Sequence, residues 1–152
     1  MGQQQLLLVI LVTIIVGIAT VVAINIFGTA AEQANIDAVR QDLLSAATQA
    51  QAVYVRPVLM GGAGGTFNNT TPEQVAAVLN IPGFRDGAVI TNDNAVYTVT
   101  AADGDAMAMS ALAASTNELW LLDVAIANGI WTITITDPDN NAVTSTTGAP
   151  QQ

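Results

Sequence analysis

Cysteine, histidine and lysine are all absent from this chain of 152 residues. Without cysteine the chain has no disulfides, no thiolate catalysis and no thiolate metal sites. Without histidine it lacks the commonest general base and transition-metal ligand. We therefore expect no enzymatic activity, no cofactor and no dedicated metal site.

Positive charge is scarce, because three arginines are set against twelve acidic residues and the net charge is -9. An acidic chain repels the phosphate backbone of nucleic acids and has no basic patch with which to bind it. Nucleic acid is therefore not an expected partner. The acidic surface instead indicates solubility and mutual repulsion between copies.

Charge is missing altogether before Glu32, and residues 6–27 form an apolar run, LLLVILVTIIVGIATVVAINIF. A helix of about 20 such residues can cross the roughly 30 Å hydrocarbon core of a membrane. A cleavable secretory signal has a basic start and a shorter apolar core, so this run matches it poorly. No basic residue precedes the run to set its orientation, which indicates that a short basic leader was removed upstream.

Helical spacing resumes after Gly28. Apolar side chains recur there at intervals of three and four and form one stripe, which predicts an amphipathic helix. The stripe consists of Ile36, Val39, Leu43, Ala47, Ala50 and Tyr54. If Gly28 does not end the helix, residues 3–55 form a single rod of roughly 80 Å, which Pro57 should stop.

Three parts follow from this pattern: a membrane-spanning or filament-core helix at residues 1–29, its amphipathic continuation at 30–56, and a globular head at 57–152. In the head, residues 60–69 are rich enough in glycine to predict a loop.

A short helix is expected at residues 72–80 of the head. Thr71 can cap its first turn, Pro72 suits the first helical position, and Gln74 completes a capping box.

β-structure is expected after the short helix, at residues 95–100, 118–127 and 130–136. Asn128 and Gly129 separate the last two runs and suit the type I′ turn of a two-residue hairpin. Residues 106–115 fit either a helix or a strand. The expected fold class is α+β, with the long helix packed on a small antiparallel sheet.

This order of elements resembles the type IV pilins and their relatives, the type II secretion pseudopilins and the archaeal pilins. The resemblance covers about the first 55 residues well and the rest in outline. In that family a prepilin peptidase removes a leader that ends in glycine, and assembly machinery packs the apolar helices into the centre of a filament. The filament-core residues so implied are Leu6, Leu7, Val9, Ile10, Ile14, Ile15, Ile18, Val21, Val22 and Ile24.

The resemblance implies a major pilin that resides in the inner (cytoplasmic) membrane as a precursor and then in an extracellular cell-surface filament of many copies. It also implies methylation and a role in cell adhesion. The mature end lies either at Met1 or, after cleavage behind Gly2, at Gln3, and the first option is favoured.

The chain departs from the bacterial pattern in three ways. Gln3, Gln4 and Gln5 occupy the stretch that usually holds a glutamate. No proline interrupts the span, which leaves Gly17, Asn25 and Gly28 as the positions for local helix melting. Nor can a disulfide close the C-terminal region.

Two alternatives remain. A pseudopilin or minor pilin shares the long helix but acts in a shorter, less abundant assembly. A monomeric, membrane-anchored binding module instead keeps its helix in lipid.

Two groups of polar residues have both a functional and a plain interpretation. Asn68 and Asn69 begin overlapping glycosylation sequons and also fit an ordinary polar loop. Asp137, Asp139 and Asn141 alternate as calcium ligands do, but they lack the glycine and the distal glutamate of an EF-hand, so a turn that ends the last strand is favoured.

The same choice applies to Asp103 and Asp105, which flank Gly104 and fit a solvated turn better than a catalytic carboxylate pair. Trp120 and Trp131 fall on the two strands of the expected hairpin. Packing of these rings across the hairpin, in the core, is favoured over a sugar-binding platform.

Overall fold

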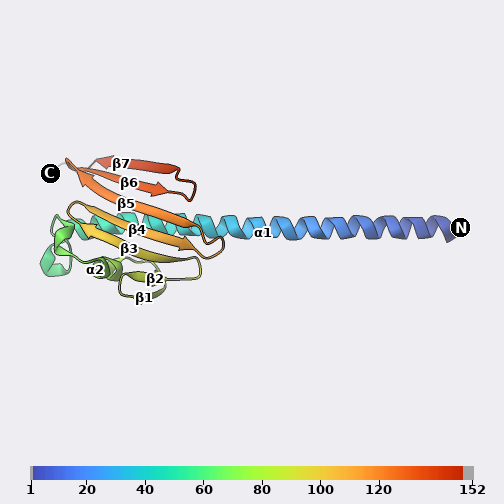
Figure 1. Ribbon diagram of the computed structural model, residues 1–152, viewed down its shortest axis with the longest axis horizontal. Helices are drawn as coiled ribbons and strands as arrows, with labels where there is room; N and C mark the ends of the chain where they lie inside the picture. Colours follow the sequence, from blue (N-terminus) through green and yellow to red (C-terminus); the bar gives the residue numbers. More distant parts are fainter. Residues whose placement is uncertain (1, 149–152) are drawn as a thin grey trace. The chain divides into compact units, whose positions relative to one another are not determined.

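The computed structural model describes residues 2–148 of the chain (Figure 1). Its first element, α1, is a helix of 54 residues, Gly2–Val55, which runs through Gly17, Asn25 and Gly28 without interruption. The chain divides after Ala34 into two compact units. The structure is α+β, with a long apolar N-terminal helix and an antiparallel sheet.

The first unit consists of helix alone. Its threonine hydroxyls donate hydrogen bonds back to carbonyls in the preceding turn: Thr20 to Val16 O at 2.8 Å, and Thr13 and Thr29 in the same manner. Each hydroxyl is thereby satisfied within the helix. One stretch of this helix is long and apolar enough to cross a membrane, by length and composition.

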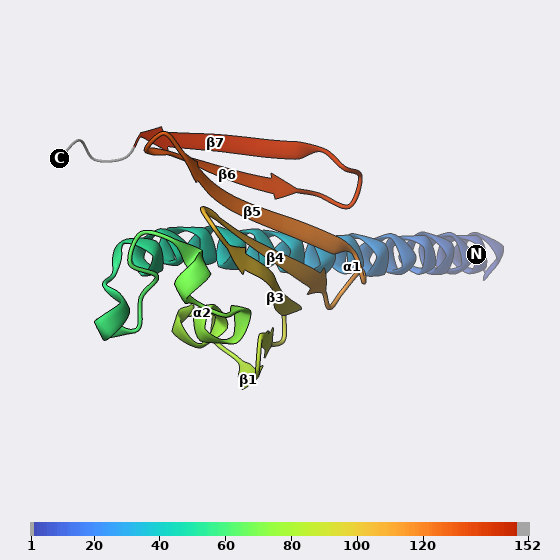
Figure 2. The same cartoon turned by 60° about the vertical axis from the view of Figure 1, so that its left-hand side comes forward.

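The second unit contains one antiparallel sheet of seven strands in chain order, β1 to β7. The strands are β1 (Phe84–Asp86), β2 (Val89–Thr91), β3 (Ala95–Asp103), β4 (Ala106–Ala113), β5 (Leu119–Ala127), β6 (Ile130–Thr136) and β7 (Ala142–Gly148). Three short elements connect α1 to the sheet: η1 (Val58–Met60), η2 (Phe67–Asn69) and α2 (Pro72–Val78). Strands β3 to β5 lie over the C-terminal part of α1, whereas β6 and β7 extend past it (Figures 1 and 2).

The core of this unit lies between α1 and the sheet. The predicted helical stripe is confirmed: Val39, Leu43, Ala47 and Ala50 are fully buried, and Ile36 and Tyr54 are partly buried against the same cluster. The sheet contributes alternate residues, as a strand with one covered face must. These residues include Tyr97, Met107, Met109, Ala111, Leu122 and Val124.

Helix α2 begins as predicted. Thr71 Oγ1 accepts a hydrogen bond from Gln74 N, and Gln74 Oε1 accepts one from Thr71 N, so the capping box is formed. The helix ends at Val78 and not at residue 80, because Leu79 has an extended backbone (φ -62°, ψ 127°). Arg85 closes this end by donating to the carbonyls of Leu79 and Ile81 at 2.6 and 3.0 Å.

The predicted β5–β6 hairpin is confirmed. Asn128 (φ 53°) and Gly129 (φ 76°) both have positive φ, as a type I′ turn requires, and Ala127 pairs with Ile130.

Residues 106–115, which fit either a helix or a strand, contain strand β4, because alternate burial of its methionines overrides the helical preference of alanine and methionine. Three sequence expectations need correction. Strand β3 continues beyond residue 100 to Asp103 across a register shift between Val99 and Ala101. The glycine-rich segment 60–69 contains the whole 3-10 turn η2 and the last residue of η1. Finally, β1, β2 and β7 were not predicted, so β6 is not the last strand.

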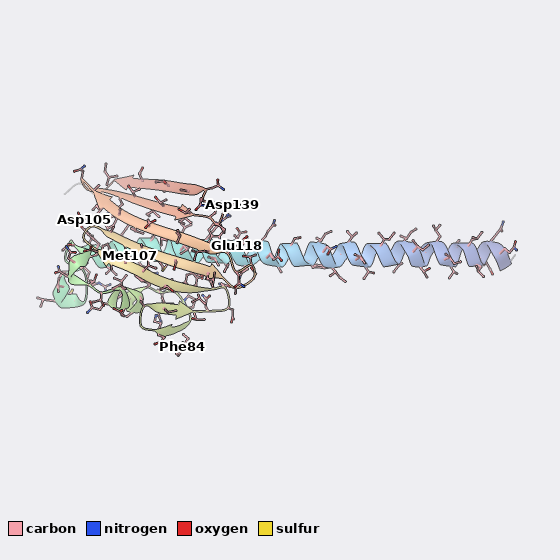
Figure 3. The ribbon with its side chains drawn as sticks, in the orientation of Figure 1. Phe84, Asp105, Met107, Glu118 and Asp139 are labelled. Carbon is pink, nitrogen blue, oxygen red and sulfur yellow. The ribbon has the colours of Figure 1, made fainter. Side chains whose placement is uncertain are left out.

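Strand β7 forms one edge of the sheet and, within residues 2–148, pairs with β6 alone. Its sequence, AVTSTTG, has no charge and no proline. The opposite edge, β1, is only three residues long and contains both Arg85 and Asp86. Figure 3 shows the exposed ring of Phe84 at that edge.

Candidate functional site

The N-terminal unit exposes apolar surface on every side of α1. The ten predicted filament-core residues are between 47% and 66% exposed. At about 100° per residue, their positions are distributed around the whole helix. A helix of this kind must be covered by lipid or by other helices.

The predicted melting positions are ordinary helical residues here. A Cβ atom added at Gly17 or Gly28 would meet no atom within 4 Å, so no close packing within the chain requires glycine at either position. Local melting concerns an assembled state and stays a prediction. The first turn of α1 contains no acidic side chain, so Gln3, Gln4 and Gln5 leave the positive end of the helix dipole uncompensated.

A polar cluster joins α1 to the sheet within the second unit. Asp42 Oδ2 accepts hydrogen bonds from the Tyr97 hydroxyl at 2.6 Å and from the amides of Asn92 and Asn94 at 3.3 and 3.5 Å. Burial, followed by the hydrogen bond to Asp42, raises the pKa of Tyr97 far above its usual range. Tyr97 therefore stays neutral at any ordinary pH, and its hydroxyl donates a hydrogen bond to Asp42.

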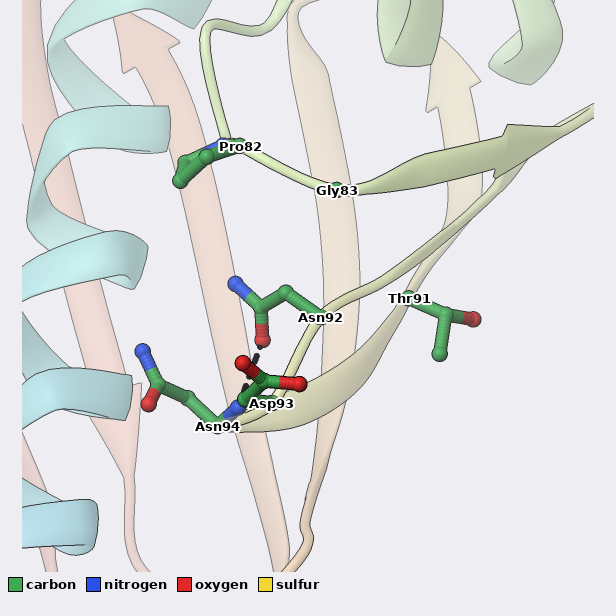
Figure 4. A pocket seen from close by; sticks show the side chains of 6 residues that line it. All are labelled: Pro82, Gly83, Thr91, Asn92, Asp93 and Asn94. Atoms are coloured by element: carbon green, nitrogen blue, oxygen red, sulfur yellow. Dashed lines mark hydrogen bonds between the residues drawn. The ribbon is translucent and has the colours of Figure 1, made fainter.

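The loop that follows β2 encloses a polar pocket of about 430 Å³ (Figure 4). Its floor is a side-chain turn, in which Asn92 Oδ1 accepts from Asn94 N and Ala95 N, both at 2.9 Å. Gly83 borders it with φ 150°, and a Cβ there would lie 2.4 Å from Thr91 O. The Asn92 side chain is used to shape the loop, and the residues that line this pocket include no nucleophile paired with a general base.

A second, more apolar groove of about 330 Å³ lies between α1 and the β6–β7 hairpin. The Arg40 guanidinium covers the Trp120 ring, with Cζ 4.7 Å from its centroid, and lies 3.7 Å from a carboxylate oxygen of Asp37. Trp120 Nε1 is buried and has no acceptor among residues 2–148. The groove is lined by Arg40, Leu44, Trp120, Ile135, Asp137, Asn141 and Val143.

The three weak calcium candidates form a turn. Asp137 Oδ1 accepts from Asn141 N at 2.7 Å, and Oδ2 accepts from Asn141 Nδ2 at 3.1 Å. The hydrogen bond from the Asn141 backbone lowers the pKa of Asp137. Asp139 points outward at the end of the hairpin (Figure 3). Within the part of the chain that is described, no three His, Cys, Asp or Glu residues are grouped so that they could hold a metal ion.

The two sequons differ in geometry although both asparagines are exposed. Asn69 Nδ2, the atom that a sugar would occupy, donates to Ala63 O at 3.0 Å. Asn68 uses its oxygen to accept from Gly104 N at 2.8 Å, and its Nδ2 has no hydrogen-bond partner in residues 2–148. Only the Asn68 amide nitrogen is therefore free of internal bonds.

Tyr54 of α1 contacts both Asp105, in the acidic turn, and Trp131. Asp105 Oδ1 accepts from the Tyr54 hydroxyl at 2.9 Å, at the turn where Gly104 has φ 55°. Trp131 packs edge-on against Tyr54, with ring centroids 5.0 Å apart.

The expected packing of the two tryptophans across the hairpin is wrong. Trp131 pairs with Ile126, whereas Trp120 lies at the other end of β5, roughly 20 Å away at strand spacing. Both rings are nevertheless buried in the core, 3% and 5% exposed.

Sequence reasoning missed one exposed apolar feature, the η1 turn, where Leu59 is completely exposed. The letters Val58-Leu59-Met60 gave no periodic signal that could have identified it. No protein-family model matches the chain, and neither a curated protein nor a solved structure shows significant similarity to it.

Proposed function

We propose that this chain is a non-catalytic structural subunit, similar to a major pilin, of an extracellular filament built from many copies. One observation supports the proposal above all: α1 exposes apolar side chains on every side through its first half, and the same helix then packs by a single stripe against a sheet. The first half has to be covered by something outside its own chain.

Copies of the same helix are a suitable cover once the subunit leaves the membrane. Val9, Ile10, Ile14, Ile15 and Ile18 are β-branched, which makes their side chains stiff and suited to close helix packing. Removing about 400 Å² of apolar surface per subunit from water would contribute roughly 10 kcal/mol. In lipid this gain largely disappears, because lipid tails are as apolar as leucine. Moving subunits from membrane to filament therefore needs powered assembly machinery, after a peptidase has removed the leader.

The same apolar surface also supports a monomeric, membrane-anchored module, since one stretch of α1 is apolar enough to span a bilayer. That protein would fractionate with lipid as single copies. A pseudopilin or minor pilin would polymerise but would be far less abundant than a main subunit.

Electron microscopy of material sheared from the cell surface, with mass measurement of its N-terminus, tests the proposal. Ile14→Asp places a charge in the filament core and should abolish filaments, whereas the matched control Ile14→Val should retain them. The fluorescence of buried Trp120 and Trp131 should be unchanged in both variants, which shows that the head still folds. Intact filaments from Ile14→Asp, or native material found only as single copies in detergent, would refute the proposal.

A further inference from the structure

The turn after α1 forms an exposed apolar projection, here called the η1 knob, made of Val55, Val58, Leu59 and Met60. Leu59 is 100% exposed and Met60 73% exposed. Figure 2 shows η1 standing clear of the sheet at the C-terminal end of α1. Apolar side chains grouped at one projecting point suggest a contact surface.

The η1 knob is held firmly by its own backbone. Met60 N donates to Pro57 O at 2.9 Å, Gly61 N to Val58 O at 3.0 Å, and Gly64 N to Arg56 O at 2.8 Å. Gly62 packs so tightly that a Cβ atom there would lie 2.2 Å from Arg56 O. A preformed projection loses little conformational entropy when it docks.

The groove between α1 and the β6–β7 hairpin matches the η1 knob in polarity. The walls that remain open are apolar, with Leu44 52% and Val143 74% exposed. Asp137 lines the groove, and Asp139 follows in the same turn. The lining thus combines apolar side chains with Asp137 and with Arg40, whose charge is already engaged with Asp37 and Trp120.

Charge supplies the second complementarity. Arg40 is engaged with Trp120 and Asp37, and Arg85 donates to two carbonyls. Arg56, beside the η1 knob, is exposed, and its side chain has no hydrogen bond or ion pair with any residue from 2 to 148. Among residues 2–148, Arg56 is the arginine whose charge is uncommitted, and its place beside the knob suits a groove that includes Asp137.

We propose that the η1 knob of one copy inserts into this groove of a neighbouring copy, with Arg56 facing Asp137 and Asp139. The inference rests on the proposed function, since it names a contact between heads of the same filament. The knob and groove of one copy cannot meet, because eleven helical residues, about 16 Å, separate Leu44 from Val55. Two different surfaces that join copies head to tail do not form an isologous dimer, and they generate an open helical polymer when the rotation between copies does not close into a ring.

The absence of cysteine makes cross-linking a clean test in the full chain. In filaments of the double variant Leu59→Cys and Val143→Cys, oxidation or a short bis-maleimide should give a ladder of covalent multimers on a non-reducing gel. On the same gel, each single variant should run as a monomer, without the ladder. The matched control pair, Leu59→Cys with Leu121→Cys, should also give no ladder, because Leu121 lies on the opposite face of the sheet.

A charge exchange provides a second measurement. Arg56→Glu should reduce the yield of filaments at least tenfold, and adding Asp139→Arg should restore most of it. Filaments that form normally without a Leu59–Val143 ladder would overturn this contact and leave the groove to a different partner, while the proposed function would stand. If the unmodified chain forms no filaments, the proposed function fails and this contact fails with it.

Discussion

At the scale of single residues, Asp42 is the acceptor on which three side chains from the sheet region converge. Its closest donor is the Tyr97 hydroxyl at 2.6 Å, and Tyr97 is completely buried. Tyr97→Phe removes that donor, and we expect the free energy of unfolding to fall by about 1.5–3 kcal/mol, the usual contribution of a hydrogen bond to a charged group. Urea denaturation followed by tryptophan fluorescence measures the change.

The dependence of stability on pH is the control for this substitution. Because the pKa of Tyr97 is raised in the folded protein, while an unfolded tyrosine ionises near about 10, its stabilising effect is complete below pH 10. It is lost as the pH rises above that value, since only the unfolded chain then releases the proton. The chain has no lysine that would obscure this decline. An equally steep alkaline decline in Tyr97→Phe would show that Tyr97 is not its source.

At the scale of secondary structure, the contact between α1 and the sheet depends on small side chains. Ala46, Ala47 and Ala50 are all completely buried. Ala47→Leu adds volume where none is free, so we expect a destabilisation of about 1–3 kcal/mol. Thermal unfolding by circular dichroism measures it. Ala52→Leu on the exposed side of the same helix should change stability by less than about 0.5 kcal/mol, and equal effects at both positions would contradict this account.

The elements that could be predicted from sequence are those with a local signal. Helix α1 has its apolar run and stripe, α2 has Thr71 and Gln74, and the β5–β6 hairpin has Asn128-Gly129. Strand β4 has alanine and methionine letters that favour a helix, so only its place between β3 and β5 makes it a strand. Strands β1 and β2 are three residues each, too short for a periodic pattern.

The features of the candidate site also differ in whether the sequence predicts them. The apolar surface of α1 can be predicted from the sequence, because residues 6–27 are apolar on every side of a helix and no single side is marked to face a core. The η1 knob and the groove cannot, since the exposure of Leu59 and the lining of one groove by both Leu44 and Val143 are set by tertiary packing of residues far apart in the sequence.

At the scale of the whole molecule, the net charge of -9 opposes association between copies. Salt shortens the range of this repulsion, with a Debye length near 30 Å at 0.01 M and about 8 Å at 0.15 M. We expect added salt to promote assembly and bundling of filaments, because repulsion between many carboxylates outweighs the single Arg56 contact. Light scattering and sedimentation measure this. Filaments that dissociate as salt is added would show that attraction between opposite charges dominates.

Strand β7 gives the sheet an open side, since β6 is its only neighbour among the strands that the structure describes. Alternate main-chain amides and carbonyls along that edge are free to pair, and neither a charged side chain nor a proline in AVTSTTG discourages it. Each copy thus offers a template on which one more strand can grow, from an adjacent fibre or from a foreign peptide, without any new side-chain chemistry.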